Sequence, residues 1–244
     1  MAISLVVWVI GTWLIGILIL NAAHRSGAGR LAQQVRTTDE GHLIGEVAIF
    51  FFHIGIPFVA IIVGVLGTDL MALGNALPNT VLGFAALEWV RGVGIAVGTL
   101  LFVMLVLWLM SRGQSAVHTS KSTWATALRE AAYNEVHWAF YRSAGALWFG
   151  DLYAGAVLGS VLIGLEWVLH PHFRAQVQSA EMRPKLVLQL ICLIVSSGLY
   201  LGVQNLWLMM AAHMLILVIG SRFLSARTTD TAAATPLNSS QPLT

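Results

Sequence analysis

Charged residues are scarce in this sequence. Only 10% of its 244 residues are charged, 57% are hydrophobic, and the mean hydropathy is +0.79. Soluble globular domains carry about 25% charged residues, so this composition excludes that class. It indicates an integral membrane protein in contact with lipid.

Further absences narrow the choice. The one cysteine, Cys192, lies in an apolar run, which excludes a disulfide framework. The net charge of +2 is spread over separate segments and forms no basic patch, so nucleic acid is excluded as a partner. No repeat of the transporter kind is evident. The first apolar run follows no basic segment and is too long for a signal-peptide core, so we interpret it as a retained helix.

Seven apolar runs are long enough to cross roughly 30 Å of hydrocarbon, which takes about 20 helical residues. They cover residues 3–22, 43–66, 86–110, 128–150, 152–170, 186–203 and 205–224. Only Gln204 and Asn205 separate the last two, which predicts a tight hairpin. The sequence therefore predicts an all-α polytopic membrane helical bundle of about seven transmembrane helices, with a disordered tail over 225–244.

The distribution of lysine and arginine predicts the orientation, because these residues favour the cytoplasmic side. With the N-terminus outside, eleven of the thirteen fall on that side. The other two, Arg91 and Arg142, lie in or at the edge of apolar runs. We expect an outside N-terminus and a cytoplasmic C-terminus, in the plasma membrane of a bacterium.

Ionisable side chains inside the apolar runs are functional candidates, because a charge in the bilayer must be paired or face water. At a rise of about 1.5 Å per helical residue, His53 lies deep and Arg142 lies near mid-membrane. Glu88 and Arg91, three residues apart at the other end, are interpreted as a structural ion pair. Five residues share the cytoplasmic leaflet: Glu46, Glu135, His137, Glu166 and His213.

Each candidate also has a structural interpretation. Glu135 and Arg142 lie two helical turns apart and could simply neutralise each other. His213 could hydrogen-bond between helices. Glu166 and His170 have the i, i+4 spacing of metal ligands, yet they stand beside a loop, where solvation is an equal explanation.

Tryptophans concentrate near the ends of the runs, where indoles anchor at the membrane interface. We predict this anchoring role for them and infer no cofactor site from their spacing. The five concerned are Trp124, Trp138, Trp148, Trp167 and Trp207.

Two stretches carry a family resemblance. The first is EAAYNEVHWAFYR, residues 130–142, and the second is SSGLYLGVQNLWLMMAAHMLILV, residues 196–218. They resemble the first and last conserved motifs of the CPBP family of CAAX proteases and bacteriocin-processing enzymes. The resemblance covers residues 125–224. It implies a CPBP-like four-helix core at 123–224, after an N-terminal three-helix membrane segment at 1–122 on which it says nothing.

The catalytic pattern of that family is only partly present. In the family, a glutamate of E-E-x-x-x-R activates water, helped by a histidine of F-x-x-x-H and by the histidine and asparagine of H-x-x-x-N. Arg142 and His213 match this pattern. The remaining positions hold His137 and Trp138 for the glutamates, Ile163 and Trp167 for the second motif, and Leu217 for the asparagine.

The resemblance implies an intramembrane peptidase that cleaves membrane-associated peptides or proteins, with Glu135 as the general base. Participation of a divalent metal stays open. One alternative is a non-enzymatic scaffold, or a subunit binding a haem-like or chlorophyll-like macrocycle through His53, His137 or His213. Another is a proton-coupled carrier. The candidate catalytic residues are Glu135, His137, Arg142, His213, Glu166 and His170.

Overall fold

The computed structural model describes residues 2–25, 39–75, 77–112, 123–170, 173–179 and 182–225. These residues form helices and their connections, with no strand among them, which confirms the all-α prediction. The tail predicted to be disordered lies outside the described residues. So do Arg30, Arg36, Lys121 and Arg227, four of the cations that predicted the orientation.

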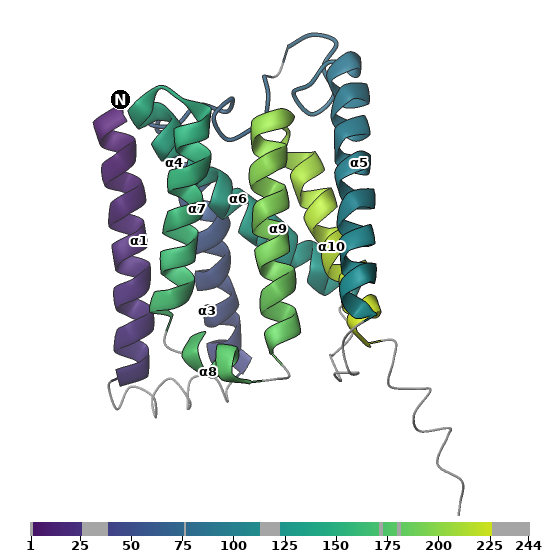
Figure 1. Cartoon of the computed structure of the whole chain (residues 1–244). Coiled ribbons are helices and arrows are strands. Elements are labelled where there is room, and N and C mark those ends of the chain that lie inside the picture. Colours follow the sequence, from purple (N-terminus) through teal and green to yellow (C-terminus); the bar gives the residue numbers. More distant parts are fainter. Residues whose placement is uncertain are drawn as a thin grey trace, which may run out of the picture.

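The helices run side by side along one axis, and α6 lies obliquely behind α9 (Figure 1). Helix α3 continues through a π-helical turn, η1, into α4, so these three elements form one uninterrupted helical segment. The bounds are α1 Ala2–Arg25, α3 Asp39–Phe50, η1 Phe51–Gly55, α4 Ile56–Ile62, α5 Ala86–Ser111, α6 Trp124–Phe149, α7 Leu152–Leu169, α8 Phe173–Gln178, α9 Arg183–Gly202 and α10 Leu206–Ser225.

Within the part of the chain that the structure describes, five helical segments are long and apolar enough to cross a membrane, so the prediction of seven spans is confirmed in part. Helix α1 contributes a shorter apolar stretch, Ser4–Leu18, and α6 is too polar to qualify. The five are Leu43–Ile62, Ala86–Met110, Leu152–Leu169, Arg183–Gly202 and Leu206–Phe223.

The middle part of α6 is polar but is enclosed by the other helices, whereas its first turns, with Trp124 and Leu128, are exposed. Every residue from Glu135 to Ala146 is buried, and α6 packs against α1, α7 and α10. A helix that is buried on all sides does not face lipid, so it needs no apolar outer surface. This arrangement explains how a helix carrying both Glu135 and Arg142 lies inside an otherwise apolar bundle.

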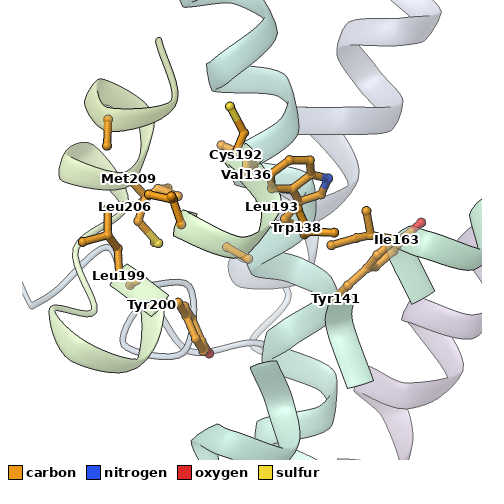
Figure 2. Packing of buried hydrophobic residues seen from close by; sticks show 14 of the residues in the cluster. Val136, Trp138, Tyr141, Ile163, Cys192, Leu193, Leu199, Tyr200, Leu206 and Met209 are labelled. Atoms are coloured by element: carbon orange, nitrogen blue, oxygen red, sulfur yellow. The ribbon is translucent and has the colours of Figure 1, made fainter. Parts of the chain in front are cut away.

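Apolar side chains from several helices fill the space around α6. Figure 2 shows Val136 and Trp138 of α6 in the same cluster as Leu193 of α9 and Met209 of α10. The lone cysteine, Cys192, is also buried there and forms no disulfide. Free cysteine behaves as a small apolar residue in such a core.

The turn between α6 and α7 is set by local chemistry. Gly150 has a positive φ of 65°, a conformation that glycine adopts without steric penalty. Asp151 then accepts hydrogen bonds from the backbone N–H groups of Tyr153 and Ala154, at 3.2 and 3.0 Å. This N-cap satisfies the first free amides of α7.

The predicted hairpin between the last two helices is confirmed. Helix α9 ends at Gly202, and Gln204 adopts a positive φ of 50°. The side-chain oxygen of Asn205 accepts from the backbone N–H of Trp207 and of Leu208, at 3.0 and 3.2 Å. The polar pair therefore turns the chain and caps α10.

The connection between α4 and α5 packs into the same end of the bundle. Its Leu66, Met71 and Ala72 are buried. The carbonyl oxygen of Leu70 accepts hydrogen bonds from Ser143 of α6 at 2.9 Å and from Tyr200 of α9 at 3.1 Å. Irregular backbone at this depth is tolerated because protein groups satisfy its polar atoms.

Helices α6 and α7 approach closely at two glycines of α7. A Cβ atom on Gly159 would lie 2.8 Å from the backbone nitrogen of Arg142, and one on Gly155 would lie 2.7 Å from that of Ala146. Small residues four apart permit such contact between membrane helices. The close approach brings the backbone of α7 against the α6 turn that carries Arg142.

We expect Gly159→Val to destabilise the protein by about 1–3 kcal/mol, because overpacking forces the two backbones apart. The matched control is Gly164→Val on the same helix, where a Cβ would meet no atom within 4 Å. Thermal unfolding of the two variants in detergent, followed by circular dichroism, measures the difference. Equal unfolding temperatures would show that the α6–α7 approach is not tight.

Candidate buried charge centre

The centre of the bundle holds a carboxylate bonded to a histidine. Glu135 of α6 and His213 of α10 are 0% and 1% exposed, and the Nδ1 of His213 lies 2.7 Å from Oε1 of Glu135. With Nδ1–H as the donor, the lone pair of the ring is on Nε2. That Nε2 is buried and has no hydrogen-bond partner among the described residues. The histidine is therefore oriented by the carboxylate.

Arg142 and Ser196 are the other polar partners of this carboxylate. The Nη1 of Arg142 lies 3.9 Å from Oε2 of Glu135, and both side chains are fully buried. Ser196 of α9 donates a hydrogen bond to Oε2 of Glu135. Arg142 in turn donates to Ser196 at 2.9 Å and to Ser197 at 3.1 Å. The centre therefore joins α6, α9 and α10.

Helix α7 joins the centre through Ser160. The hydroxyl oxygens of Ser160 on α7 and Ser197 on α9 lie 3.0 Å apart. The Ser160 hydroxyl also donates to the carbonyl of Ala156, and the Ser197 hydroxyl donates to that of Leu193. Either hydroxyl can donate only one proton at a time. The polar groups connected to Arg142, directly or through one other side chain, therefore come from four helices.

A second polar cluster lies on another face of α6. The Nε2 of His137 lies 3.4 Å from Oε2 of Glu166 on α7. The ring of His53, in the π-helical turn, has its centroid 4.9 Å from that of His137. The Nδ1 of His53 lies 2.9 Å from the carbonyl oxygen of Ile49. Such π-helical turns recur at functional sites.

A cavity of about 180 Å³ adjoins this second cluster, between α7, α8 and α9. Both Glu166 and His170, the i, i+4 pair of the sequence, lie on its wall. Glu135 and His213 do not. The lining residues are Glu166, Trp167, His170, Phe173, Met182, Lys185, Leu186 and Gln189.

Two indoles lie between the cavity and the buried centre. Trp167 lines the cavity and packs edge-on against Trp138, with ring centroids 6.2 Å apart. Trp138 is 3% exposed and stacks on the ring of His213 at 5.2 Å. The prediction that Trp138 anchors at the membrane interface is therefore wrong: it is a core residue. Trp138 lies near the middle of α6, Trp124–Phe149, and its contacts with Trp167 and His213 place it inside the bundle.

Glu46, which was also predicted to share the cytoplasmic leaflet, lies apart from both clusters. Glu46 lies at the surface and pairs with Arg129 at 3.2 Å.

The predicted ion pair between Glu88 and Arg91 is wrong, since no ion pair joins these two described residues. Glu88 instead accepts a hydrogen bond from the backbone N–H of Ala85 at 2.7 Å. Helical spacing permits a pair, but the carboxylate caps its own helix.

The donor atoms do not gather into a metal site. Within the described part of the chain, no group of three or more His, Cys, Asp or Glu side chains is arranged to hold a metal ion. His213 and Glu135 bond to each other, and His137 and Glu166 do the same. The residues present therefore do not fit the divalent metal that the resemblance left open.

Serines were the residues that sequence reasoning missed. Ser196 and Ser197 accept the side-chain hydrogen bonds of Arg142, yet the sequence marks them only as part of the stretch that carries the family resemblance. Their signal was two adjacent hydroxyls inside the apolar run 186–203. Polar side chains inside a membrane helix usually seek partners on neighbouring helices.

Comparison of the chain with protein-family models, with curated proteins and with solved structures finds no match.

We expect Glu135→Ala to destabilise the protein by about 3–5 kcal/mol, because it leaves the buried Arg142 without its counter-charge. Unfolding by denaturant in mixed micelles measures the loss. The matched control is Glu46→Ala, which breaks the exposed pair with Arg129 and should lose no more than about 1 kcal/mol.

A double variant isolates the charge effect. Glu135→Leu combined with Arg142→Met removes both charges and should recover a large part of the stability lost in Glu135→Ala, since apolar replacement of a buried pair is often tolerated. A double variant as unstable as the single one would show that packing, rather than pairing, dominates at this centre.

Proposed function

We propose that the protein is a non-enzymatic membrane scaffold with a CPBP-like arrangement of α6, α7, α9 and α10. One observation carries the proposal. Three of the positions that the resemblance assigns to catalysis, 138, 167 and 213, lie together, but two of them hold indoles: Trp138 packs on Trp167 and on the ring of His213. At these positions, two of the polar groups that the family pattern would require are replaced by apolar ring systems.

The surroundings of the Glu135 carboxylate support the same proposal. A general base must accept a proton from water within hydrogen-bond reach. Glu135 instead accepts from His213 and Ser196 and faces Arg142, and its side chain is fully buried. Leu217 occupies the position of the family's asparagine and is 5% exposed. Because its side chain is apolar, it supplies no hydrogen-bond donor to a developing oxyanion.

The scaffold role follows from the way the buried charge centre links the helices. It ties α6, α9 and α10 at one depth, and the Ser160–Ser197 contact adds α7. Buried polar groups that bond one another across helices favour one packing arrangement over its alternatives. A rigid bundle with lipid-facing apolar surfaces can then present fixed surfaces to other membrane components.

An intramembrane peptidase is the second candidate, favoured by the bond between Glu135 and His213. A carboxylate that orients Nδ1–H of a histidine leaves Nε2 basic, as in hydrolytic triads. In this candidate His213, rather than Glu135, takes the proton from water and Glu135 positions it. The reaction would need water to reach the centre from the cavity beside Trp167.

Thiol labelling tests whether water reaches the centre. In a Cys192→Ala background, we expect Ser196→Cys to resist a membrane-impermeant methanethiosulfonate in the folded protein, because residue 196 is 2% exposed and sits beside Glu135. Gln189→Cys, on the cavity wall, should react readily and is the matched control. Mass spectrometry of the intact protein measures both.

Labelling of Ser196→Cys at a rate near that of Gln189→Cys would overturn the scaffold proposal. It would show an aqueous path to Glu135 and His213, which is what the peptidase candidate requires. Labelling of Ser196→Cys only after addition of Trp167→Ala would instead confirm that the indoles close the path.

We further propose that the N-terminus lies outside the cytoplasm and that the ends carrying Arg112, Arg183 and Arg222 face the cytoplasm. The C-terminal ends of α5 and α10 and the N-terminal end of α9, to which these cations belong, lie at the end of the bundle opposite the start of α1 (Figure 1). Positive residues favour the cytoplasmic side. Reporter fusions truncated after Asn75 and after Arg112 should report opposite sides, outside and inside. The same side for both would contradict this orientation.

A further inference from the structure

A long cleft runs between α5 and α9, away from the charge centre. At the end where α5 begins it is a polar hollow of about 460 Å³. Its wall comes from the α4–α5 connection, the first turns of α5 and the α9–α10 turn. The lining residues are Asp69, Gly74, Asn75, Phe84, Glu88, Arg91, Gly92, Ile95, Leu201, Gly202, Val203 and Gln204.

The polar hollow contains charges of both signs. Glu88 uses one oxygen to accept the backbone N–H of Ala85. Among the described residues, neither Asp69 nor Arg91 makes a side-chain hydrogen bond or an ion pair. These side chains can therefore bind one anionic and one cationic group of a ligand at the same time. Arginine suits phosphate, since its planar guanidinium donates two parallel hydrogen bonds.

Below this hollow the cleft continues as an apolar groove of about 490 Å³. Ile95 lines both parts, and Leu199 of the groove lies two residues from Leu201 of the polar hollow. The groove is lined by Ile95, Thr99, Phe102, Val103, Val106, Ile191, Ile194, Val195, Gly198 and Leu199. The two parts form one cleft with a charged head and an apolar body.

The packing of α5 explains why the cleft exists. Helix α5 approaches α10 so closely that a Cβ on Gly92 would lie 2.6 Å from Leu208. On the α9 side, a Cβ on Gly198 would meet no atom within 4 Å. From Ile95 to Val106 the groove extends about 16 Å along the helix, at about 1.5 Å per residue. That is close to the depth of one leaflet, half of roughly 30 Å.

We propose that this cleft binds one phospholipid that carries a primary ammonium in its head group, as phosphatidylethanolamine does. Arg91 binds the phosphate, Asp69 and Glu88 bind the ammonium, and one acyl chain lies in the apolar groove. A free zwitterion such as an amino acid would leave the groove empty, and a lipid with only an anionic head would leave both carboxylates unpaired. This site is independent of the scaffold proposal, because it uses neither Glu135 nor His213.

The chain-binding part is tested by filling the groove. We expect Gly198→Leu to lower retention of phosphatidylethanolamine about tenfold, because its side chain occupies open space in the groove. The matched control is Gly94→Leu on α5, which also meets no atom within 4 Å and does not line the cleft. Native mass spectrometry of protein released from nanodiscs counts the bound lipid.

The head-group part is tested by competition. In nanodiscs with equal phosphatidylethanolamine and phosphatidylglycerol, the wild type should retain the former preferentially, and Asp69→Asn with Glu88→Gln should abolish that preference. Arg91→Gln should weaken retention of both lipids about tenfold, the effect of losing one charge-assisted contact. Arg222→Gln, at the other end of the bundle, is the control.

Three outcomes would overturn the proposal. They are equal retention by Gly198→Leu and Gly94→Leu, no head-group preference in the wild type, and a preference that survives removal of both carboxylates. Labelling of Ser196→Cys reports on the charge centre alone, so failure of the scaffold proposal leaves these measurements unaffected.

Discussion

The fold depends on the attraction between Glu135 and Arg142, two opposite charges on one helix with no exposed surface. Neither charge can be left alone, because removing one partner of a buried pair costs about 3–5 kcal/mol. Other helices supply their hydrogen-bond partners: Ser196 and His213 bond Glu135, and Ser196 and Ser197 accept from Arg142. The helices must therefore assemble around α6 in one register, with α9 and α10 at matching depths.

That requirement shapes the rest of the bundle. Helix α6 is too polar to face lipid, so α1, α7 and α10 cover it, and the glycines of α7 let the backbone of that helix approach the Arg142 turn. The α4–α5 connection closes one end by accepting hydrogen bonds at Leu70. Lipid then meets mainly apolar helices, and the polar groups are confined to the interior and the two ends.

Closure of the centre has a chemical consequence. The cavity reaches Glu166 and His170, while Trp138 and Trp167 separate it from His213. A carboxylate that already accepts two hydrogen bonds beside an arginine stabilises a structure better than it activates water. The ligand-binding potential lies elsewhere, in the cleft between α5 and α9, where Asp69 and Arg91 have no protein partner among the described residues.

Composition and apolar run length determined the membrane class, the all-α fold and the hairpin at Asn205, because these depend on local hydropathy and on short-range capping. Sequence also singled out Glu135, Arg142 and His213, since charge inside an apolar run is conspicuous. Only the tertiary structure decided which groups meet. The rotation and approach of the helices decide whether Glu88 bonds Arg91 or Ala85, whether Trp138 faces lipid or His213, and whether Ser196 reaches Glu135. Contacts between residues far apart in the chain set that rotation and approach.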